Sequence, residues 1–332
     1  MIRVAINGFG RIGRLAFRQI ITATDFDIVA INDLGNAVEL SYLLKYDTVH
    51  RAFHEDLIRY INNDIIINNV KKVRVFNEID PENLPWGDLN VDLVLECTGK
   101  FTKYEDAYKH IKAGAKKVLI SAPSKSDNVK TVVYNVNESI LDGTEEVISA
   151  ASCTTNCLAP LAKIIEDNIG ITSGYMSTIH AYTNDQATLD ISHKKGIKSR
   201  RGRACAANII PTSTGAASAI GKVIPSLDGK LDGIAYRVPV EDGSMIELTF
   251  IPKRATSVDE INGLISNNTN ETLAITFDPV VSSDIIGKKY GALVDGLSTS
   301  INNNLVKVVA WYDNEYGYTA QMLRTAKILF KK

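Results

Sequence analysis

The sequence has few of the features that mark secreted, membrane-spanning or nucleic-acid-binding proteins. Four cysteines in 332 residues are too few for a disulfide framework, which favours a reducing, cytoplasmic setting. No apolar run approaches the ~18 residues of a membrane helix, and the first residues lack the pattern of a signal peptide. With 37 basic and 38 acidic side chains, the net charge gives no general attraction to polyanions. We therefore expect neither nucleic acid nor membrane as a primary partner.

The composition is that of an ordinary globular protein, and the length exceeds that of one usual hydrophobic core, so two domains are expected. Up to about residue 150, apolar runs alternate with helix-period segments: a strand at 2–6, a helix at 11–21, a strand at 27–31 and a helix at 104–113. This alternation predicts a parallel sheet. Beyond Ser152, longer segments rich in Thr, Val and Ile predict a mostly antiparallel sheet.

A glycine-rich motif lies between the first predicted strand and the first predicted helix. Gly8, Gly10 and Gly13 form a GxGxxG pattern, which lets backbone N–H groups approach a pyrophosphate at a helix N-terminus. Asp33 ends the second predicted strand, where a ribose-binding carboxylate belongs, and its charge would repel a 2′-phosphate. The pattern predicts NAD binding. A plain turn, with Asp33 capping the next helix, is the alternative.

A second focus is Cys153, which directly precedes a helix-period run. A thiol at a helix start meets unpaired N–H groups, and we expect these to lower its pKa from about 8.5 and suit it to nucleophilic attack. Alternatives remain: Cys153 and Cys157 could form a metal pair or a regulatory disulfide, or could be plain buried cysteines. We expect the last for Cys97 and Cys205, and for Cys157.

One histidine and one basic loop can be assigned a function only if they have suitable neighbours in the fold. His180 ends a predicted strand, and a lone histidine is usually a surface or satisfied core residue unless it has a partner such as the Cys153 thiol. Residues 184–207 carry six Lys or Arg side chains without a clear period, which indicates a long loop. Taken alone, such a loop is most simply a solvated surface.

With these residues in view, the sequence resembles the glyceraldehyde-3-phosphate dehydrogenase family over essentially its whole length. The motifs that carry the resemblance occur in the same order, and are residues 6–14, 152–157, 180–183, 211–217, 236–239 and 311–315. The resemblance implies an α/β fold with a Rossmann-type parallel-sheet domain and a second α+β catalytic domain. Its implied bounds are 1–152, completed by a C-terminal helix at 315–332, for NAD binding, and 153–314 for catalysis.

The resemblance also implies a reaction. Cys153 attacks the aldehyde of glyceraldehyde 3-phosphate, and His180 activates the thiol and then takes the hydroxyl proton as hydride leaves for NAD. Inorganic phosphate resolves the resulting thioester and gives 1,3-bisphosphoglycerate in glycolysis or its reverse.

Further roles follow from position in the family motifs. Substrate and phosphate contacts are implied for Ser152, Thr154, Thr183, Arg201, Thr214, Gly215 and Arg237. Cofactor contacts are implied for Asn7, Gly8, Gly10, Arg11, Ile12, Gly13, Asn32, Asp33, Gly99, Ser121 and Asn314. The basic loop resembles the family's S-shaped loop, which lines a neighbouring subunit's cofactor site in a homotetramer. No metal is implied.

Two departures and two rival functions accompany this interpretation. Ser192 stands where strictly NAD-specific members commonly have Pro, and the loop at 194–199 is longer than in many relatives, so some use of NADP is compatible with the sequence. The enzymatic alternative is an erythrose-4-phosphate dehydrogenase. The non-enzymatic alternative is an interaction protein that uses the basic loop at 184–207.

Overall fold

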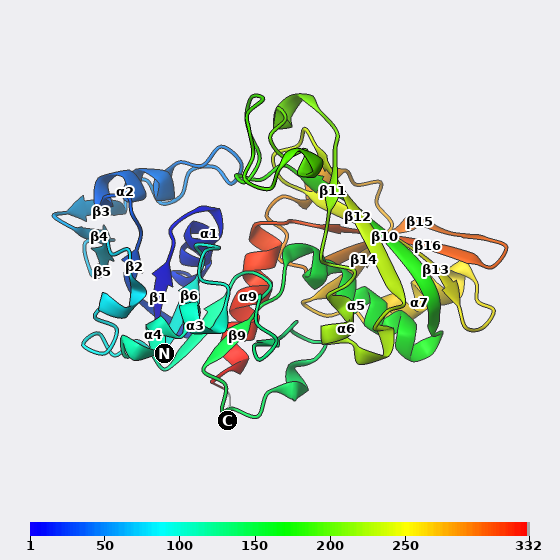
Figure 1. Cartoon of the computed structure of the whole chain (residues 1–332), viewed down its shortest axis with the longest axis horizontal. Coiled ribbons are helices and arrows are strands. Elements are labelled where there is room, and N and C mark those ends of the chain that lie inside the picture. Colours follow the sequence, from blue (N-terminus) through cyan, green and yellow to red (C-terminus); the bar gives the residue numbers. More distant parts are fainter. Residues whose placement is uncertain (331–332) are drawn as a thin grey trace. The chain divides into compact units, whose positions relative to one another are not determined.

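A computed structural model describes residues 1–330 of the chain, which divide into two compact units (Figure 1). Unit 1 comprises Met1–Val132, Glu138–Ala151 and the residues from Met322 on, and unit 2 comprises Val133–Asn137 and Ser152–Gln321. The last helix of the described chain, α9 (Tyr316–Ile328), therefore begins in unit 2 and ends in unit 1. The expected functional domains, 1–152 with 315–332 and 153–314, remain a prediction.

Within the described residues, unit 1 contains a nine-stranded sheet in the order β3-β4-β5-β2-β1-β6-β7-β9-β8. The pairs from β5 to β8 are parallel, and the ribbon β3-β4-β5 is antiparallel. The sequence prediction of a mainly parallel sheet is thus confirmed. The strands are β1 (Ile2–Asn7), β2 (Phe26–Asn32), β3 (Ile58–Ile61), β4 (Asp64–Ile67), β5 (Lys71–Phe76), β6 (Leu93–Glu96), β7 (Lys117–Ile120), β8 (Lys130–Thr131) and β9 (Val147–Ser149).

Unit 1 also contains α1 (Arg11–Ile20), α2 (Ala37–Lys45), α3 (Tyr104–Ala107) and α4 (Lys109–Lys112). The single helix predicted at 104–113 is wrong in detail, because the chain tightens at Tyr108, whose carbonyl accepts from Ile111 N–H three residues on, and α3 and α4 are separate. Short 3₁₀ turns occur at Pro81–Asn83 and Glu138–Ile140.

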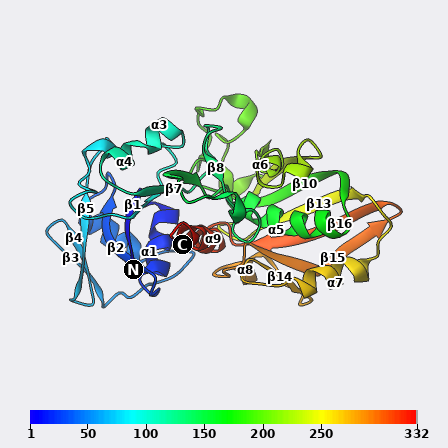
Figure 2. The same cartoon turned by 90° about the horizontal axis from the view of Figure 1, so that it is seen from below.

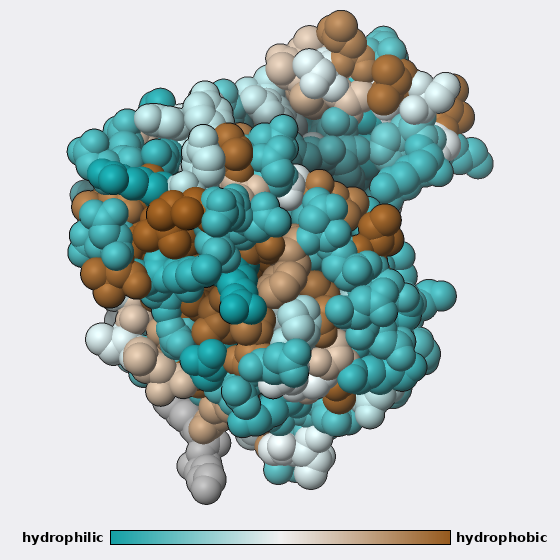
Figure 3. Space-filling model, turned by 90° about the vertical axis from the view of Figure 1, so that its left-hand side faces the viewer, coloured by the Kyte–Doolittle hydropathy of each residue, from teal (hydrophilic) through white to brown (hydrophobic). Residues whose placement is uncertain are grey.

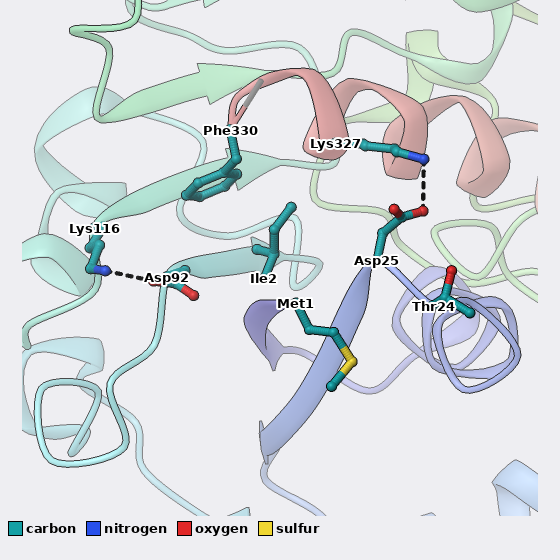
Figure 4. Close-up of a pocket in the computed structure, with 8 residues that line it drawn as sticks. All are labelled: Met1, Ile2, Thr24, Asp25, Asp92, Lys116, Lys327 and Phe330. Carbon is teal, nitrogen blue, oxygen red and sulfur yellow. Dashed lines mark hydrogen bonds and ion pairs between the residues drawn. The ribbon is translucent and has the colours of Figure 1, made fainter. Parts of the chain in front are cut away.

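The end of α9 belongs to the core of unit 1. Met322, Leu323 and Ala326 pack with the strand residues Val4 and Ile6 in one buried cluster. At the surface Lys327 pairs with Asp25 at 2.7 Å, beside a shallow pocket that also contains a Lys116–Asp92 pair (Figure 4). Apolar packing holds this helix end, and the exposed ion pair adds little to it.

Unit 2 contains a seven-stranded sheet, within the described chain, in the order β11-β12-β10-β13-β16-β15-β14. Most neighbours are antiparallel, as predicted, whereas β10–β12 and β14–β15 are parallel. The strands are β10 (Ile171–Ala181), β11 (Ile210–Ser213), β12 (Leu231–Val238), β13 (Ser244–Pro252), β14 (Leu273–Thr276), β15 (Ala292–Asn302) and β16 (Leu305–Tyr312).

The two long helices of unit 2 pack on its sheet: α5 (Cys153–Asn168) contacts β13, β15 and β16, and α7 (Val258–Asn267) lies beside β14 and β15 (Figure 2). Strand β13 alternates, with Ile246, Leu248 and Phe250 buried and the residues between them more exposed. This period-two pattern is that of a sheet with one covered face. The remaining short elements are α6 (Ile220–Val223), α8 (Ser282–Ile285) and 3₁₀ turns at Ile197–Ser199, Cys205–Ala207 and Pro225–Leu227.

The surface carries apolar side chains among hydrophilic ones (Figure 3). The larger exposed side chains of unit 1 include Val38, Tyr42, Tyr60 and Ile61. Among residues 1–330, no helix combines the length and apolar character that crossing a bilayer requires.

Candidate active site

The glycine-rich turn joins β1 to α1, as the motif predicts. Gly8 has φ +91°, and a Cβ there would lie 2.7 Å from Thr98 N. A Cβ on Gly13 would lie 2.1 Å from Gly8 O, so both positions require glycine for close packing. Helix α1 begins after Gly10, which has no side chain to cap it. Its first N–H groups therefore form a potential anion site.

The polar residues predicted around this turn all lie in unit 1, but several have protein partners. Asp33 accepts from Phe9 N at 2.7 Å and from Gly35 N at 2.9 Å, which places its carboxylate beside the glycine turn. Asn32 Nδ2 donates to Asn7 Oδ1 at 2.7 Å, so these two side chains bond to each other inside the sheet. These hydrogen bonds hold the three side chains beside the glycine-rich turn.

Four further cofactor candidates occupy the same unit. Arg11 forms an ion pair with Asp47, and Ile12 in the first turn of α1 is half-buried. Gly99 has φ +68° with open space where a Cβ would be, and Ser121 N donates to Glu96 O at 3.0 Å after β7. Open space at Gly99 suits the close approach of a ligand to the backbone.

Cys153 is the first residue of α5 in unit 2, as expected. The preceding Ser152 is the N-cap of the helix, and its Oγ accepts from Thr155 N at 3.1 Å. The Cys153 sulfur is therefore not needed to cap the helix. Cys153 is partly exposed, whereas Cys157 and Cys205 are buried. The interpretation of Cys157 and Cys205 as plain buried cysteines fits the structure, and Cys97 is only partly buried.

His180 lies at the end of β10 and faces the thiol, with 3.5 Å between its Nε2 and Cys153 Sγ. Its Nδ1 lies 2.7 Å from Ala181 O, a contact that requires the proton on Nδ1. Nε2 then presents a lone pair to the sulfur. The geometry is that of a nucleophile and its base, with the base held by a backbone carbonyl.

Burial governs the charge of this pair. It raises the pKa of the Cys153 thiol, although Arg237 and hydrogen bonds at the helix start act in the opposite direction. It also lowers the pKa of His180 to about 3, an effect to which the Arg237 charge adds. The expectation that the helix start would lower the pKa of Cys153 is therefore wrong, because desolvation outweighs the donors. A neutral thiol facing a neutral imidazole is the favoured state.

Arg237 is brought beside His180 by strand register, since the two residues are partners in the parallel pair β10–β12. Its Nη1 donates to Ala181 O and Thr183 Oγ1, both at 3.0 Å, and lies 3.1 Å from His180 Nδ1. Within residues 1–330, Arg237 Nε and Gln186 Nε2 are buried donors that have no hydrogen-bond acceptor. Buried donors without partners indicate a place for a polar ligand.

The remaining anion-site candidates are distributed around this cluster. Arg201 pairs with Asp185, and its Nε lies 3.3 Å from Thr212 Oγ1. Thr154 is buried, and its hydroxyl lies 3.0 Å from Tyr312 OH. Thr214 and the exposed Gly215 form the turn after β11, where Thr214 Oγ1 accepts from Ala216 N at 3.2 Å. The structure thus joins Thr183, Arg201 and Arg237 through Asp185, and directs the Thr154 hydroxyl elsewhere.

Comparison with known proteins covers nearly the whole chain. Residues 2–104 match the family model of the glyceraldehyde 3-phosphate dehydrogenase NAD binding domain, and residues 152–314 match that of the C-terminal domain. The glyceraldehyde-3-phosphate dehydrogenase of Clostridium acetobutylicum is 54% identical, with 98% of this chain and 97% of that protein covered. The proteins of that name from Clostridium pasteurianum (54%) and Streptococcus pyogenes (52%) are covered to 99%, and each comparison spans 100% of this chain.

The chain belongs to the glyceraldehyde-3-phosphate dehydrogenase family. This confirms the resemblance drawn from the motifs, the α/β fold class and NAD as the cofactor. An NAD-dependent oxidoreductase also fits the start of α1, whose N-cap residue Gly10 has no side chain to cap the helix.

Within the candidate site of unit 2, the sequence did not indicate two supporting residues, Tyr312 and Ser244. The Tyr312 ring packs edge-on against His180 with centroids 5.9 Å apart, and its hydroxyl lies 2.8 Å from Thr178 Oγ1. Ser244 Oγ donates to Asn314 Oδ1 at 2.5 Å and accepts from Ala181 N at 3.0 Å. Tyr312 belongs to the motif at 311–315, but the sequence does not show that it lies beside His180. Nothing in the sequence singles out Ser244.

Proposed function

We propose that the chain oxidises and phosphorylates glyceraldehyde 3-phosphate to 1,3-bisphosphoglycerate in the cytoplasm, with Cys153 as nucleophile and His180 as acid–base. Family membership supports the substrate and the cofactor. The observation that carries the residue roles is the 3.5 Å contact between Cys153 Sγ and His180 Nε2. The erythrose-4-phosphate and interaction-protein alternatives are not favoured, because the curated relatives are glyceraldehyde-3-phosphate dehydrogenases.

The pair performs proton transfer in two stages. As the sulfur attacks the aldehyde carbon, its proton passes to His180 Nε2 and from there to the former carbonyl oxygen, so that a neutral thiohemiacetal forms and Nε2 is again unprotonated. His180 then accepts the proton of the thiohemiacetal hydroxyl as hydride leaves the same carbon, which gives a thioester on Cys153. NAD, when bound, accepts that hydride. A phosphate oxygen finally attacks the thioester carbonyl, and the sulfur leaves as the acyl phosphate is released.

The base must stay neutral and correctly oriented for these steps. Ala181 O holds the Nδ1 proton, and Tyr312 packs against the ring. The low pKa of His180 keeps Nε2 unprotonated at neutral pH. Partial burial also limits water near the thioester, which favours phosphate over hydrolysis.

Two anions need donors near this pair. Arg237 and Thr183 are assigned to the phosphate of the substrate, and the unpartnered Arg237 Nε and Gln186 Nε2 support a polar ligand there. The attacking phosphate is assigned to Ser152, Thr154, Thr214 and Gly215, with Arg201 nearby. For Thr154 the backbone is the better donor, since its hydroxyl contacts Tyr312.

NAD would be held by unit 1. The N–H groups at the start of α1 would receive the pyrophosphate, and Asp33 the adenosine ribose. Asn314 is assigned to the nicotinamide amide from its position in the family motif, and Ser244 bonds its Oδ1, which leaves the amide Nδ2 as the donor for that contact. The remaining predicted contacts are Asn7, Gly8, Gly10, Arg11, Ile12, Gly13, Asn32, Gly99 and Ser121.

A homotetramer is part of the proposal. In the loop at 184–207, Leu189, Ile191 and Ile197 are exposed, and Ile197 is 94% exposed. On the sheet of unit 2, Tyr175 and Ile251 are exposed as well. Exposed apolar side chains concentrated on a loop and a sheet are typical of subunit interfaces.

The deciding experiment is NAD reduction with glyceraldehyde 3-phosphate, with and without inorganic phosphate. Turnover that requires phosphate is expected, together with a strong preference over erythrose 4-phosphate. Equal turnover without phosphate would contradict the proposed resolution of the thioester. Light scattering on the same sample should give the mass of four chains per particle. The mass of a single chain would contradict the proposed homotetramer.

A further inference from the structure

Three strands of unit 1 end in polar residues that lie directly opposite one another. Asn7 of β1 is the register partner of Asn32 in β2 and of Glu96 in β6. Each of them leads into a stretch assigned to the cofactor: Gly8, Asp33 and, after Thr98, Gly99. The row therefore spans the carboxyl edge of the parallel sheet, where such folds bind their ligands.

The three side chains form one buried chain of hydrogen bonds. Glu96 Oε2 accepts from Asn7 Nδ2 at 2.5 Å, and Asn7 Oδ1 accepts from Asn32 Nδ2 at 2.7 Å. Asn32 continues the chain to the backbone of Glu78, with bonds of 2.8 and 2.9 Å. Because all three side chains are at most 4% exposed, water cannot replace these bonds.

Glu96 holds the row together because its carboxylate has a donor on every side. Oε1 accepts from the backbone N of Thr98 at 2.8 Å and from the Thr98 hydroxyl. Oε2 accepts from Asn7 and lies 3.1 Å from His110 Nε2. A fully buried carboxylate is stable only with such donors. The bonds to Thr98 also shape the turn that leads to Gly99.

His110 is the last donor of this set, and Trp86 determines its tautomer. The Trp86 indole Nε1–H donates to His110 Nδ1 at 2.9 Å, so Nδ1 must be the acceptor. The proton therefore lies on Nε2 and points to Glu96. Asn7 Nδ2 and His110 Nε2 lie 3.3 Å apart because both donate to the same oxygen. Trp86, His110 and Glu96 are all 0% exposed.

We propose that His110, oriented by Trp86, is a positioning residue for the dinucleotide site and acts through Glu96. It holds the ends of β1, β2 and β6 in the spacing that a dinucleotide requires. The proposal rests on the proposed function, since NAD is the ligand whose site is positioned. His110 contributes to the affinity for NAD, whereas the chemistry belongs to Cys153 and His180.

The main variant is His110→Phe, which keeps a ring in the core and removes both ring nitrogens. We expect its Kd for NAD, measured by titration calorimetry, to rise about 10- to 100-fold, the range for loss of one hydrogen bond to a buried charge. The kcat at saturating NAD should stay within about twofold. The matched control is His110→Gln, whose amide N–H can still donate to Glu96 and should restore most of the affinity.

A second variant tests the tautomer without touching the histidine. Trp86→Phe removes the donor to Nδ1, so the His110 proton can move to Nδ1 and leave an acceptor facing Glu96. We expect the Kd for NAD to rise about threefold to tenfold, with the rate of Cys153 alkylation unchanged. This variant decides the question if His110→Phe does not fold.

The outcomes separate the two proposals. Wild-type affinity for NAD in a folded His110→Phe, or in Trp86→Phe should His110→Phe not fold, would overturn this inference and leave the proposed function intact. A fall in kcat with an unchanged Kd for NAD would also overturn this inference and leave the proposed function intact. Failure of the unsubstituted protein to bind NAD would instead contradict the proposed function.

Discussion

Two buried histidines in this chain show how similar residues serve different ends. His110 in unit 1 has both ring nitrogens bonded inside the protein, to Trp86 and Glu96. His180 in unit 2 has one nitrogen held by Ala181 O, while the other faces the Cys153 thiol. The surroundings differ in the same way, since the Glu96 carboxylate is fully bonded whereas Arg237 keeps a buried N–H without an acceptor. A hydrogen-bond network whose polar atoms all have protein partners, like that of His110, fixes the position of its neighbours. A network with an unpartnered buried donor, like that of His180 and Arg237, can bind a ligand.

The largest effect is expected at the incomplete network. Cys153→Ser removes the nucleophile, so NAD reduction should fall on the order of 10⁴-fold or more. Affinity for NAD and the thermal midpoint should stay near those of the unsubstituted protein, because the sulfur supports neither. Steady-state assays, calorimetry and a melting curve measure the three quantities. Normal turnover would contradict the assignment of Cys153.

Arg237→Met should show a large but selective effect. Loss of a buried charged donor should lower kcat/KM for glyceraldehyde 3-phosphate about 10²-fold or more. Turnover of unphosphorylated glyceraldehyde should change much less, and stability should fall by no more than about 2 kcal/mol, because the bonds to Ala181 O and Thr183 are lost together with the unpartnered Nε. An equal loss toward both aldehydes would remove Arg237 from the phosphate site.

Two neighbouring carboxyl groups in unit 2, those of Asp313 and Asp242, differ in their surroundings. Asp313 accepts from the backbone N of Gly287, Glu315 and Tyr316 at 2.6–2.9 Å. Burial, followed by the charges of Asp313 and Glu315, raises the pKa of the nearby Asp242 to about 9. Asp242 therefore favours its protonated form, whereas Asp313 accepts three backbone N–H bonds.

The two substitutions should act in opposite directions on stability. Asp313→Asn should lower stability by about 2 kcal/mol through its lost hydrogen bonds, a fall of several degrees in the thermal midpoint. Because the pKa of Asp242 is raised in the folded protein, its contribution to stability is fully present below about pH 4. That contribution is lost progressively as the pH rises from there toward 9. Asp242→Asn cannot ionise, so its midpoint should match or exceed that of the unsubstituted protein at pH 8. The reverse order of midpoints would contradict the assignment.

The smallest effect is expected at an exposed pair that belongs to neither network. Lys327→Met breaks the pair with Asp25, whose side chains are 45% and 43% exposed. Such pairs contribute about 0–1 kcal/mol, so the thermal midpoint should move by no more than about 3 °C. A fall as large as that of Asp313→Asn would show that the helix end depends on this ion pair.

Local patterns predicted much of the fold and part of the site. The glycine spacing and Asp33 indicated the turn between β1 and α1, and Cys153 was expected at the start of a helix. These predictions succeeded because each depends on neighbours along the chain. The pKa of Cys153 was predicted wrongly, since burial depends on residues far away in sequence.

Contacts between residues that are distant in sequence could not be predicted from local sequence patterns. Glu96 ends an apolar strand, and nothing nearby in the sequence indicates that His110 and Asn7 bond to it. Likewise, Thr154 was expected at a phosphate, but the packing of α5 on β16 brings its hydroxyl to Tyr312. A side chain's partner depends on register and packing, which only the folded chain supplies.

The central claim is that His180 is the base for the Cys153 thiol. Its most direct test is the rate of iodoacetamide alkylation at pH 7 in the unsubstituted protein and in His180→Asn, with Cys153→Ser to correct for other cysteines. We predict alkylation about 10- to 100-fold slower in His180→Asn, together with a 10²- to 10⁴-fold loss of NAD reduction. Equal alkylation rates would show that His180 does not activate the thiol.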